Sequence, residues 1–447
     1  MRETWASRFG FVMATAGFAV GLGNIWRFPT MTGNNGGGAF LVVYLLFAFW
    51  IGIPLLTAEI SLGRQAQRTP IAGMQRLTGS WRHPWNLIGW LGVVASLIVQ
   101  SYYVMLIGWI LGYFVRIVRG GLSDATVDSL GADFAAFTAS PVPVLGYTAI
   151  VVLILVAIVG RGLRGGLERV ASVAMPLLVV LLVALAVRSL TFPGAWRGLV
   201  WYLQPDFGSI DGATILAALG QAFFSIGIGM ATAFGFGSYL ARDTSDVPGN
   251  AAIVVVFDTA IAVLAGLVIF PALFAFGIEP DAGPGLLFVT MTGLFAEMPA
   301  GQLFGATFFF LLLLAAITSS AALHEVLVVT WIDLVPVGRR TATWGLAGLF
   351  LLLSVPMILS QGPWADVQVA GMDLFTFADT VSGSYLLPIG ALILVLYTAT
   401  HWGFERFRDD TNRGAGRIRV TTWWKPLMLC VIPVAMILVL LGGIGLV

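Results

Sequence analysis

The first apolar run of the chain holds the sequence that decides the fold, GFAVGLGN at residues 17–24. Glycine in a helix interior costs about 1 kcal/mol relative to alanine, so this run predicts an interrupted helix. Close packing between membrane helices is the alternative reason for such glycines. A second glycine-rich run, SIGIGM at residues 225–230, lies five apolar segments further along. Paired interruptions at matching places in two halves of a chain indicate a midplane binding site between inverted repeats.

The composition of the chain excludes most other classes of protein. Its 447 residues are 58% hydrophobic and only 10% charged, with a mean hydropathy of +0.94. A soluble domain has about 25% charged residues, and a disordered chain has low hydrophobicity and high charge. The net charge of +1 argues against nucleic acid as a partner. The single cysteine, Cys430, cannot form an intramolecular disulfide. The lipid bilayer is therefore the expected surrounding of this protein.

Eleven apolar segments are long enough to cross a bilayer, which takes a helix of about 20 residues. We place them near residues 9–28, 38–62, 86–115, 143–160, 168–187, 213–240, 250–276, 301–332, 342–360, 376–400 and 426–446. The less apolar stretch 277–300 is expected to form a re-entrant or capping element. The predicted fold class is an all-α integral membrane protein.

The basic residues predict the orientation. With the N-terminus in the cytoplasm, the outside has only Arg27, Arg116, Arg119, Arg188 and Arg197 of the 23 Lys and Arg residues. An odd number of spans then leaves the C-terminus outside a multi-pass protein of the cell membrane. The Arg-rich loop 401–425 has two explanations, a patch for anionic lipids or ordinary positive-inside bias, and we favour the second.

Four acidic residues lie in or near apolar segments, where a charge is costly and is a candidate for function. They are Glu59, Asp258, Glu325 and Asp379. For Glu59 and Glu325 we favour hydrogen bonding to the freed backbone of a broken helix over contact with a substrate. Asp258 has no basic residue in its segment, so we favour a bound cation as its partner over the alternative of a neutral, protonated acid.

The eighth segment carries three hydroxyl side chains, Thr318, Ser319 and Ser320. Such hydroxyls usually bond carbonyls of their own helix, and ligation of an ion is the alternative. The H-E-x-x-H zinc pattern is absent at His324, and no P-loop or G-x-S-x-G motif is present. We therefore expect no enzyme.

Several longer motifs resemble those of the neurotransmitter:sodium symporters, whose bacterial members include the leucine transporter. They are RETWASRFGFVMATAGFAVGLGNIWRFPTMTGNNGGGAF at 2–40, GIPLLTAEISLGR at 52–64, SYY at 101–103, GQAFFSIGIGM at 220–230 and ITSSAALHEV at 317–326. The resemblance covers essentially the whole chain. It implies the LeuT fold in one transmembrane domain, 1–447. Five-span inverted repeats would lie at about 7–190 and 210–400, with an eleventh helix at about 424–446.

The resemblance also implies roles for individual residues. The substrate pocket would be lined by Phe18, Ala19, Gly21, Gly23, Val99, Tyr103, Phe224, Ser225, Gly227, Met230, Ser319 and Leu323. One sodium site would use Ala19, Asn24, Ser225 and Asp258, and a second Gly17, Val20, Ala315, Thr318 and Ser319. An outer ion-pair gate would join Arg27 to Asp379, with Asp373 a weaker candidate. An inner gate would join Arg2 to Asp333, near Trp5 and Tyr239.

Departures from the family pattern refine the expected substrate. Gly21 stands where monoamine carriers have an aspartate, which predicts an amino acid rather than an amine. Gly227 stands where the leucine transporter has a serine, and we expect it to enlarge the pocket. Ala262 can neither carry charge nor bind an anion, so Asp258 would balance the sodium ion without chloride. Gly235-Phe236 replaces the usual Thr-Tyr pair shortly before Tyr239, which is a departure from the family pattern near the inner gate.

The hypothesis from the sequence is a symporter, monomeric or homodimeric, that imports a neutral, large hydrophobic or aromatic amino acid with two Na⁺. A channel is one alternative, although it predicts a repeated filter motif that this chain lacks. A sensor that binds the amino acid without transporting it is the other.

Overall fold

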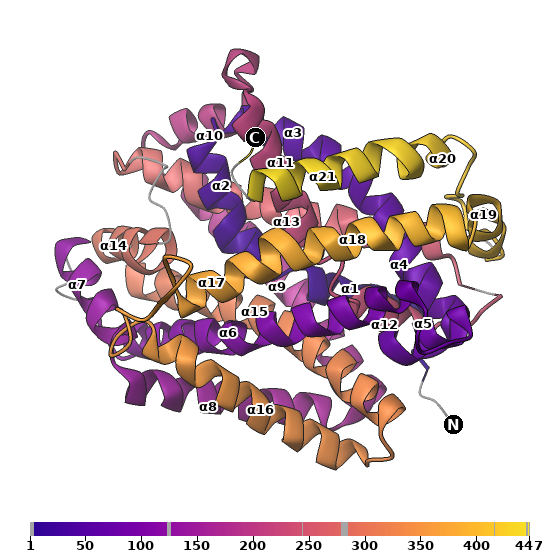
Figure 1. Ribbon diagram of the computed structural model, residues 1–447. Helices are drawn as coiled ribbons and strands as arrows, with labels where there is room; N and C mark the ends of the chain where they lie inside the picture. The colour runs from indigo at the N-terminus through magenta and orange to yellow at the C-terminus, as the bar shows by residue number, and fades with distance from the viewer. Residues whose placement is uncertain are drawn as a thin grey trace.

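The structure of the protein is a computed structural model that describes residues 4–122, 127–243, 245–278, 285–414, 416–443 and 446. Nearly all of this part is helical (Figure 1). Its β-structure is one antiparallel pair, β1 (Gln368–Val369) and β2 (Met372–Asp373), in which Gln368 faces Asp373. The predicted all-α fold class is correct.

The long apolar elements follow one another through the chain. They are α1 (Arg8–Ala19) with η1 (Gly23–Arg27) and α2 (Phe28–Asn34); α3 (Gly38–Phe47), η2 (Ala48–Gly52) and α4 (Ile53–Ala66); η3 (Pro84–Asn86) and α6 (Leu87–Val118); α8 (Pro141–Val159); η4 (Leu163–Glu168) and α9 (Arg169–Leu190); α11 (Gly212–Ile226) and α12 (Thr232–Gly237); α13 (Val247–Ala275); α15 (Gly301–Leu334); α16 (Arg339–Leu359); α17 (Leu374–Thr380), η7 (Val381–Leu386), α18 (Leu387–Leu396) and η8 (Tyr397–His401); and α20 (Trp424–Pro426), η9 (Leu427–Val431) and α21 (Ile432–Gly443).

Shorter helices connect them. They are α5 (Pro70–Thr78), α7 (Val127–Thr138), α10 (Ala195–Leu203), η5 (Phe207–Ser209), η6 (Leu286–Met291), α14 (Thr292–Glu297) and α19 (Phe404–Thr411). In the expected capping stretch 277–300, η6 and α14 form such short helices, with Phe288 stacked on Phe134 of α7. Residues 279–284 of that stretch lie outside the described part.

Nine helical stretches in the described part are long and apolar enough to cross a membrane, and a bent pair makes a tenth. The bent pair is Arg8–Ala19 with Gly23–Asn34, at 52°. The first predicted segment, 9–28, was therefore too short by six residues at its end. The predicted segment 213–240 corresponds to α11 and α12, neither of which is long enough to cross alone.

Both glycine-rich runs interrupt their helices, as predicted. Helix α1 ends at Ala19, and Val20 has an extended conformation with ψ of 106°. Between α11 and α12, Gly227 and Gly229 have φ of 70° and 87°. Glycine adopts such positive φ values without a steric penalty, which other residues pay. The two breaks lie side by side, because Ser225 and Asn24 are hydrogen bonded across them.

Helix α1 runs through the centre of the molecule, and every residue from Gly10 to Ile25 is buried. It packs against α9, α13 and α15, while α6 and α18 cross in front of it (Figure 1). Side chains of the two breaks are therefore reached only through the surrounding helices or from the two ends of the bundle.

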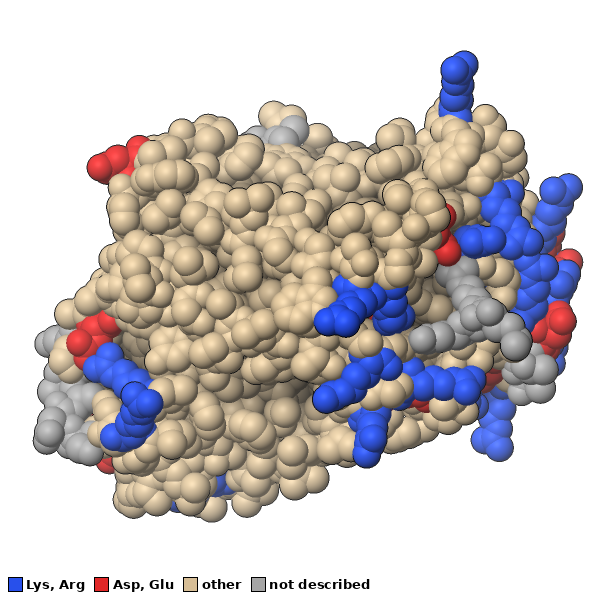
Figure 2. Space-filling model, turned by 90° about the horizontal axis from the view of Figure 1, so that it is seen from below, with Lys and Arg blue, Asp and Glu red and all other residues tan. Residues whose placement is uncertain are grey.

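Lys and Arg gather at one end of the molecule, where Figure 1 places α5 and α19 (Figure 2). We call this the basic end, and the end that carries α7, α10 and α14 the opposite end. The predicted orientation rests on this asymmetry and places the basic end in the cytoplasm.

Candidate functional site

A small cavity lies between the two helix breaks. It is lined by Phe18, Ala19, Gly21, Gly23, Val99, Tyr102, Tyr103, Phe224, Ser225, Gly227, Met230, Ser319 and Leu323. All twelve residues predicted for the pocket are in this lining, and Tyr102 is the addition. The adjacent tyrosines of the SYY motif both line this cavity, whereas the sequence analysis placed only Tyr103 there. The volume of about 40 Å³ holds a few waters, so a bound amino acid requires side chains to move.

The backbone of the first break meets polar side chains on one wall of this cavity. The amide N–H of Leu22 donates to the Tyr103 hydroxyl at 3.2 Å, and the Ser319 hydroxyl donates to the Phe18 carbonyl at 2.9 Å. A Cβ at Gly21 would lie 2.6 Å from the Tyr103 oxygen. Only glycine therefore fits at position 21 in this arrangement.

The opposite wall is apolar, and one expectation about it was wrong. A Cβ at Gly227 would lie 2.5 Å from the Phe18 ring. The space that glycine frees at this position is thus filled by Phe18, so Gly227 does not enlarge the empty pocket. Val99, Met230 and Leu323 complete the wall, and all are buried.

Three buried polar side chains, Asn24, Ser225 and Asp258, form a cluster beside the cavity. Asn24 Nδ2 donates to Asp258 Oδ1 at 2.7 Å and to Ser225 Oγ at 3.1 Å. Ser225 Oγ donates to Asp258 Oδ2 at 2.8 Å, and Asn24 Oδ1 accepts from the Gly21 amide at 3.0 Å. Among the described residues, Asp258 forms no ion pair with Lys or Arg. A cation in this cluster would therefore meet an uncompensated carboxylate.

The second predicted ion site lies where α1 packs against α15. Thr318 Oγ1 donates to the carbonyls of Leu314 and Ala315, both at 2.9 Å. A Cβ at Gly17 would contact Thr318 at 3.4 Å, and Val20 lies at the break itself. The Thr318 hydroxyl bonds its own helix, whereas the Ser319 hydroxyl crosses to the broken helix. Gly17, Thr318 and Ser319 thus lie at one contact between the two helices, with Ala315 and Val20 next to it in sequence.

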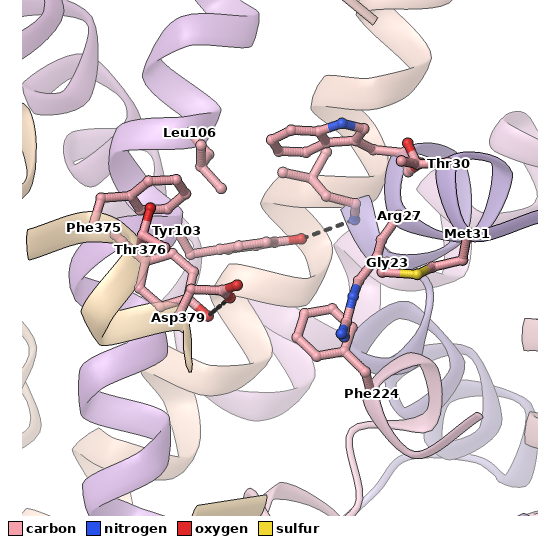
Figure 3. A pocket seen from close by; sticks show the side chains of 13 residues that line it. Gly23, Arg27, Thr30, Met31, Tyr103, Leu106, Phe224, Phe375, Thr376 and Asp379 are labelled. Atoms are coloured by element: carbon pink, nitrogen blue, oxygen red, sulfur yellow. Dashed lines mark hydrogen bonds between the residues drawn. The ribbon is translucent and has the colours of Figure 1, made fainter. Parts of the chain in front are cut away.

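A larger cavity of about 310 Å³ lies above the site towards the opposite end (Figure 3). Figure 3 shows Arg27 beside Phe224, with Asp379 across the cavity from them. The guanidinium lies 4.2 Å from the centre of the Phe224 ring, and Asp379 Oδ1 accepts from the Tyr102 hydroxyl at 3.0 Å. The predicted Arg27–Asp379 ion pair is absent from the described structure, because the open cavity separates the two side chains. Asp373, the weaker candidate, caps α17 by accepting from Phe375 N and Thr376 N.

The basic end of the site is closed by aromatic packing. Trp5 lies edge-on to Phe11, Phe236 and Tyr239, with ring centres 5.4, 5.3 and 6.2 Å away, and its Nε1 donates to the Phe236 carbonyl. Asp333 accepts from Thr69 N at 2.9 Å and from Thr69 Oγ1 at 2.8 Å. Arg2, its predicted gate partner, lies outside the described residues.

The two glutamates have different roles. Glu59 accepts from the amides of Gly229 and Phe234 at 3.2 and 3.4 Å, so its predicted bonds to a broken helix are confirmed. The Glu325 carboxylate forms an ion pair with Arg339 and accepts from the Tyr239 hydroxyl at 3.5 Å, and its bonding to a freed backbone stays a prediction. Arg339 begins α16, and only the tertiary fold brings it to Glu325.

Two helices broken side by side in the membrane, with polar groups at the breaks, define a secondary transporter. The profile of the Sodium:neurotransmitter symporter family matches residues 2–130 and 127–445, and the chain belongs to this family. The sodium-dependent transporter YhdH of Bacillus subtilis is 38% identical over 443 residues, which are 99% of this chain and 97% of the relative. A sodium-dependent transporter of Haemophilus influenzae is 32% identical, covering 99% and 98% of the two chains.

A crystal structure of MhsT in complex with L-phenylalanine is also similar. It shares 38% identity and a TM-score of 0.90, covering 99% of this chain and 100% of the other. The chain is therefore a multi-pass membrane symporter with the LeuT fold that depends on sodium, and a transporter rather than an enzyme.

Proposed function

We propose that the protein imports a neutral amino acid with a large apolar side chain, driven by Na⁺, by alternating access. The observation that carries this proposal is the position of the carboxylate cluster directly beside an apolar pocket. Asn24 bonds both the Asp258 carboxylate and the Gly21 amide that borders the pocket. One end of a substrate in the pocket would thus lie next to the ion cluster.

The helix breaks suit a zwitterion. The carbonyl end of α1 at Ala19 carries a partial negative charge, and the amide end of η1 at Gly23 a partial positive charge. The substrate amine would face the first and the carboxylate the second. The Tyr103 hydroxyl, which now accepts from Leu22, has its proton free to donate to that carboxylate.

The first Na⁺ would bind the Ala19 carbonyl, Asn24, Ser225 and Asp258, together with the substrate carboxylate. Sodium is a hard cation that prefers oxygen, and the oxygens of Asp258 now accept only neutral donors. The ion would replace these donors. A shared ion shell explains coupling, because the substrate completes the site of its own driving ion.

The second Na⁺ would bind at the α1–α15 contact. Its ligands would be the carbonyls of Gly17, Val20 and Ala315 and the hydroxyls of Thr318 and Ser319. This ion would hold the broken helix against α15, and its loss would free α1 to move. Only neutral oxygens take part, which suits a monovalent ion that must also leave.

The side chain of the substrate would occupy the apolar wall. Apolar burial favours binding by about 25 cal/mol per Å², whereas a charge there would be unpaired. Met230 is flexible, and its movement together with Phe18 would provide the missing volume. MhsT, a similar protein of known structure, was crystallised with L-phenylalanine, which supports an aromatic substrate.

Competition binding to the purified protein in Na⁺ tests the substrate class. Leucine, phenylalanine and tryptophan are expected to compete, and glutamate and lysine are not. Tryptamine is the control for the α-carboxylate, since it keeps the ring of tryptophan and lacks only that group. Binding of tryptamine as tight as that of tryptophan would contradict the proposed carboxylate contact.

A further inference from the structure

One carboxylate at the basic end holds the chain segment that closes the inner side of the site. Glu168, the last residue of η4, accepts from Ala6 N at 3.0 Å through Oε2 and from Ser7 N at 3.2 Å through Oε1. The Ser7 hydroxyl also donates to Oε1 at 3.4 Å. Glu168 is 162 residues away in sequence from Ala6 and is only 5% exposed.

These bonds need a carboxylate. Each of the two oxygens accepts from a different backbone N–H, and neither N–H has a helical partner because both precede the first turn of α1. The negative charge also lies at the positive end of the α1 dipole. A glutamine at position 168 would present an NH₂ group to one of the two donors.

The contact is close and extends into α1. Ser7 is the N-cap of α1, and its hydroxyl accepts from Gly10 N at 2.9 Å. A Cβ at Gly10 would overlap the Glu168 carboxylate. Arg164, four residues earlier in η4, donates to the carbonyl and the hydroxyl of Thr4, both at 2.6 Å. One turn of the chain before α9 thus binds residues 4–7.

The bound segment includes the residue that covers the site. Trp5 lies between Thr4 and Ala6, and it packs on Phe236 and Tyr239. Side-chain contacts also hold the segment, because Arg164 bonds Thr4 and Arg8 reaches Asn250 and Asp246 with a side chain that is 57% exposed. Release of the bonds to Glu168 would free the two backbone amides next to Trp5 and leave these contacts, the Trp5 Nε1 bond to Phe236 and the ring contacts.

We propose that Glu168 is a positioning residue of the transport cycle. Its hydrogen bonds to Ala6 and Ser7 keep Trp5 packed on Phe236 and Tyr239 while the opposite end is open, and they break when the basic end opens. The inference rests on the proposed alternating-access transport. It adds that η4 and α9 control the inner closure directly, through backbone amides of the N-terminal segment.

Hydrogen exchange of the purified protein in Na⁺ tests this role. In Glu168→Gln, exchange in residues 4–12 and 232–240 is expected to rise about tenfold, the effect of losing one charge-assisted hydrogen bond. Alternating access also requires the opposite end to close in compensation, so exchange in α17 is expected to fall. Glu405→Gln is the matched control, since it makes the same change in a half-exposed carboxylate of the basic end that does not touch residues 4–7.

Gly10→Ala is a second variant, which displaces the carboxylate from the other side of the contact and is expected to give the same pattern. Faster exchange confined to residues 4–12, with α17 unchanged in both variants, would overturn the proposal and leave Glu168 as a local helix cap. Because exchange reports conformation without a transported solute, this result is independent of which amino acid the protein carries.

Discussion

At the scale of single residues, Gly21 is a position where the backbone of the first break approaches the pocket side chains closely. Its amide bonds Asn24, and its Cα faces the Tyr103 hydroxyl and Ser319. The position therefore links the proposed ion shell to the proposed carboxylate contact. The signal in the sequence was the glycine itself, because a larger residue cannot occupy position 21 while Tyr103 keeps its place.

Gly21→Ala is expected to lower substrate affinity by at least tenfold. The added Cβ would lie 2.6 Å from the Tyr103 oxygen and push the ring out of place. Gly220→Ala is the matched control, because a Cβ at that glycine meets nothing within 4 Å. Equilibrium binding in saturating Na⁺ measures both variants. Equal affinities in the two variants would show that the phenol does not contact the substrate.

Asp258 leads to a prediction about chloride. Ala262, one turn further along α13, is fully buried and offers no anion ligand, so the Asp258 carboxylate is the proposed source of the negative charge. Wild-type uptake is expected to be unchanged when gluconate replaces chloride.

Asp258→Asn removes that charge and is expected to reduce Na⁺-driven uptake at least tenfold. Adding Ala262→Ser to this variant is expected to restore part of the uptake in chloride but not in gluconate. The comparison of the three proteins in the two salts is the measurement. Loss of wild-type uptake in gluconate would refute the assignment of Asp258 as the balancing charge.

At the scale of elements, the second broken helix begins with a strong cap. Asp211 Oδ1 accepts from Thr214 N at 2.7 Å at the start of α11, and these hydrogen bonds lower the pKa of the Asp211 carboxyl. Because the folded pKa is below the unfolded value of about 3.9, the stabilisation is present above that value. It is lost as the pH falls through the lowered folded pKa.

Asp211→Ala is therefore expected to lower the Tm at pH 7, with a smaller effect near pH 3, where the wild-type cap is itself becoming protonated. Asp206→Ala is the control, as this carboxylate on the same loop caps only the three-residue helix η5. Thermal unfolding in detergent at the two pH values gives the comparison. If the Tm of Asp211→Ala lies as far below that of the wild type near pH 3 as at pH 7, the cap stabilises α11 without its charge.

A structural element could be predicted from the sequence where residues within the element itself determine it. Both breaks were evident from the sequence, since the residues that interrupt the helices are the glycines themselves. The end of the first segment was not, because Pro29 and Asn34 continue as α2 after the bend. The Glu325–Arg339 pair joins two helices, and no local pattern marks it. The separation of Arg27 from Asp379 belongs to one conformation of the transporter, which a sequence does not specify.

At the scale of the whole molecule, the open cavity at the opposite end and the aromatic closure at the basic end are what the proposed alternating access expects of one of its states. Substrate would enter past Phe224, and Arg27 would swing from that ring to Asp379 as the cavity closes. Opening of the basic end would then require Trp5 to leave Phe236. The two ends are linked through the first broken helix, because Trp5 precedes α1 at the basic end and Arg27 ends η1 in the cavity at the opposite end.

The number of Na⁺ ions that move with each substrate molecule sets the driving force for its accumulation. Two Na⁺ that move with a zwitterion carry two charges, and each is worth about 2.3 kcal/mol per 100 mV. The membrane potential alone would then sustain a concentration ratio on the order of 10³ at full coupling. Thr318→Ala with Ser319→Ala removes both hydroxyls of the proposed second ion site and is expected to abolish accumulation.

The central claim is tested most directly by accumulation of labelled leucine, phenylalanine or tryptophan in proteoliposomes. An inward Na⁺ gradient with a negative interior is expected to drive the internal concentration above the external one, and collapse of the gradient to abolish the excess. A sensor would bind the amino acid without accumulation, and a channel would equilibrate it without Na⁺. Either result, obtained with protein that binds Na⁺ and amino acid normally, would contradict the account.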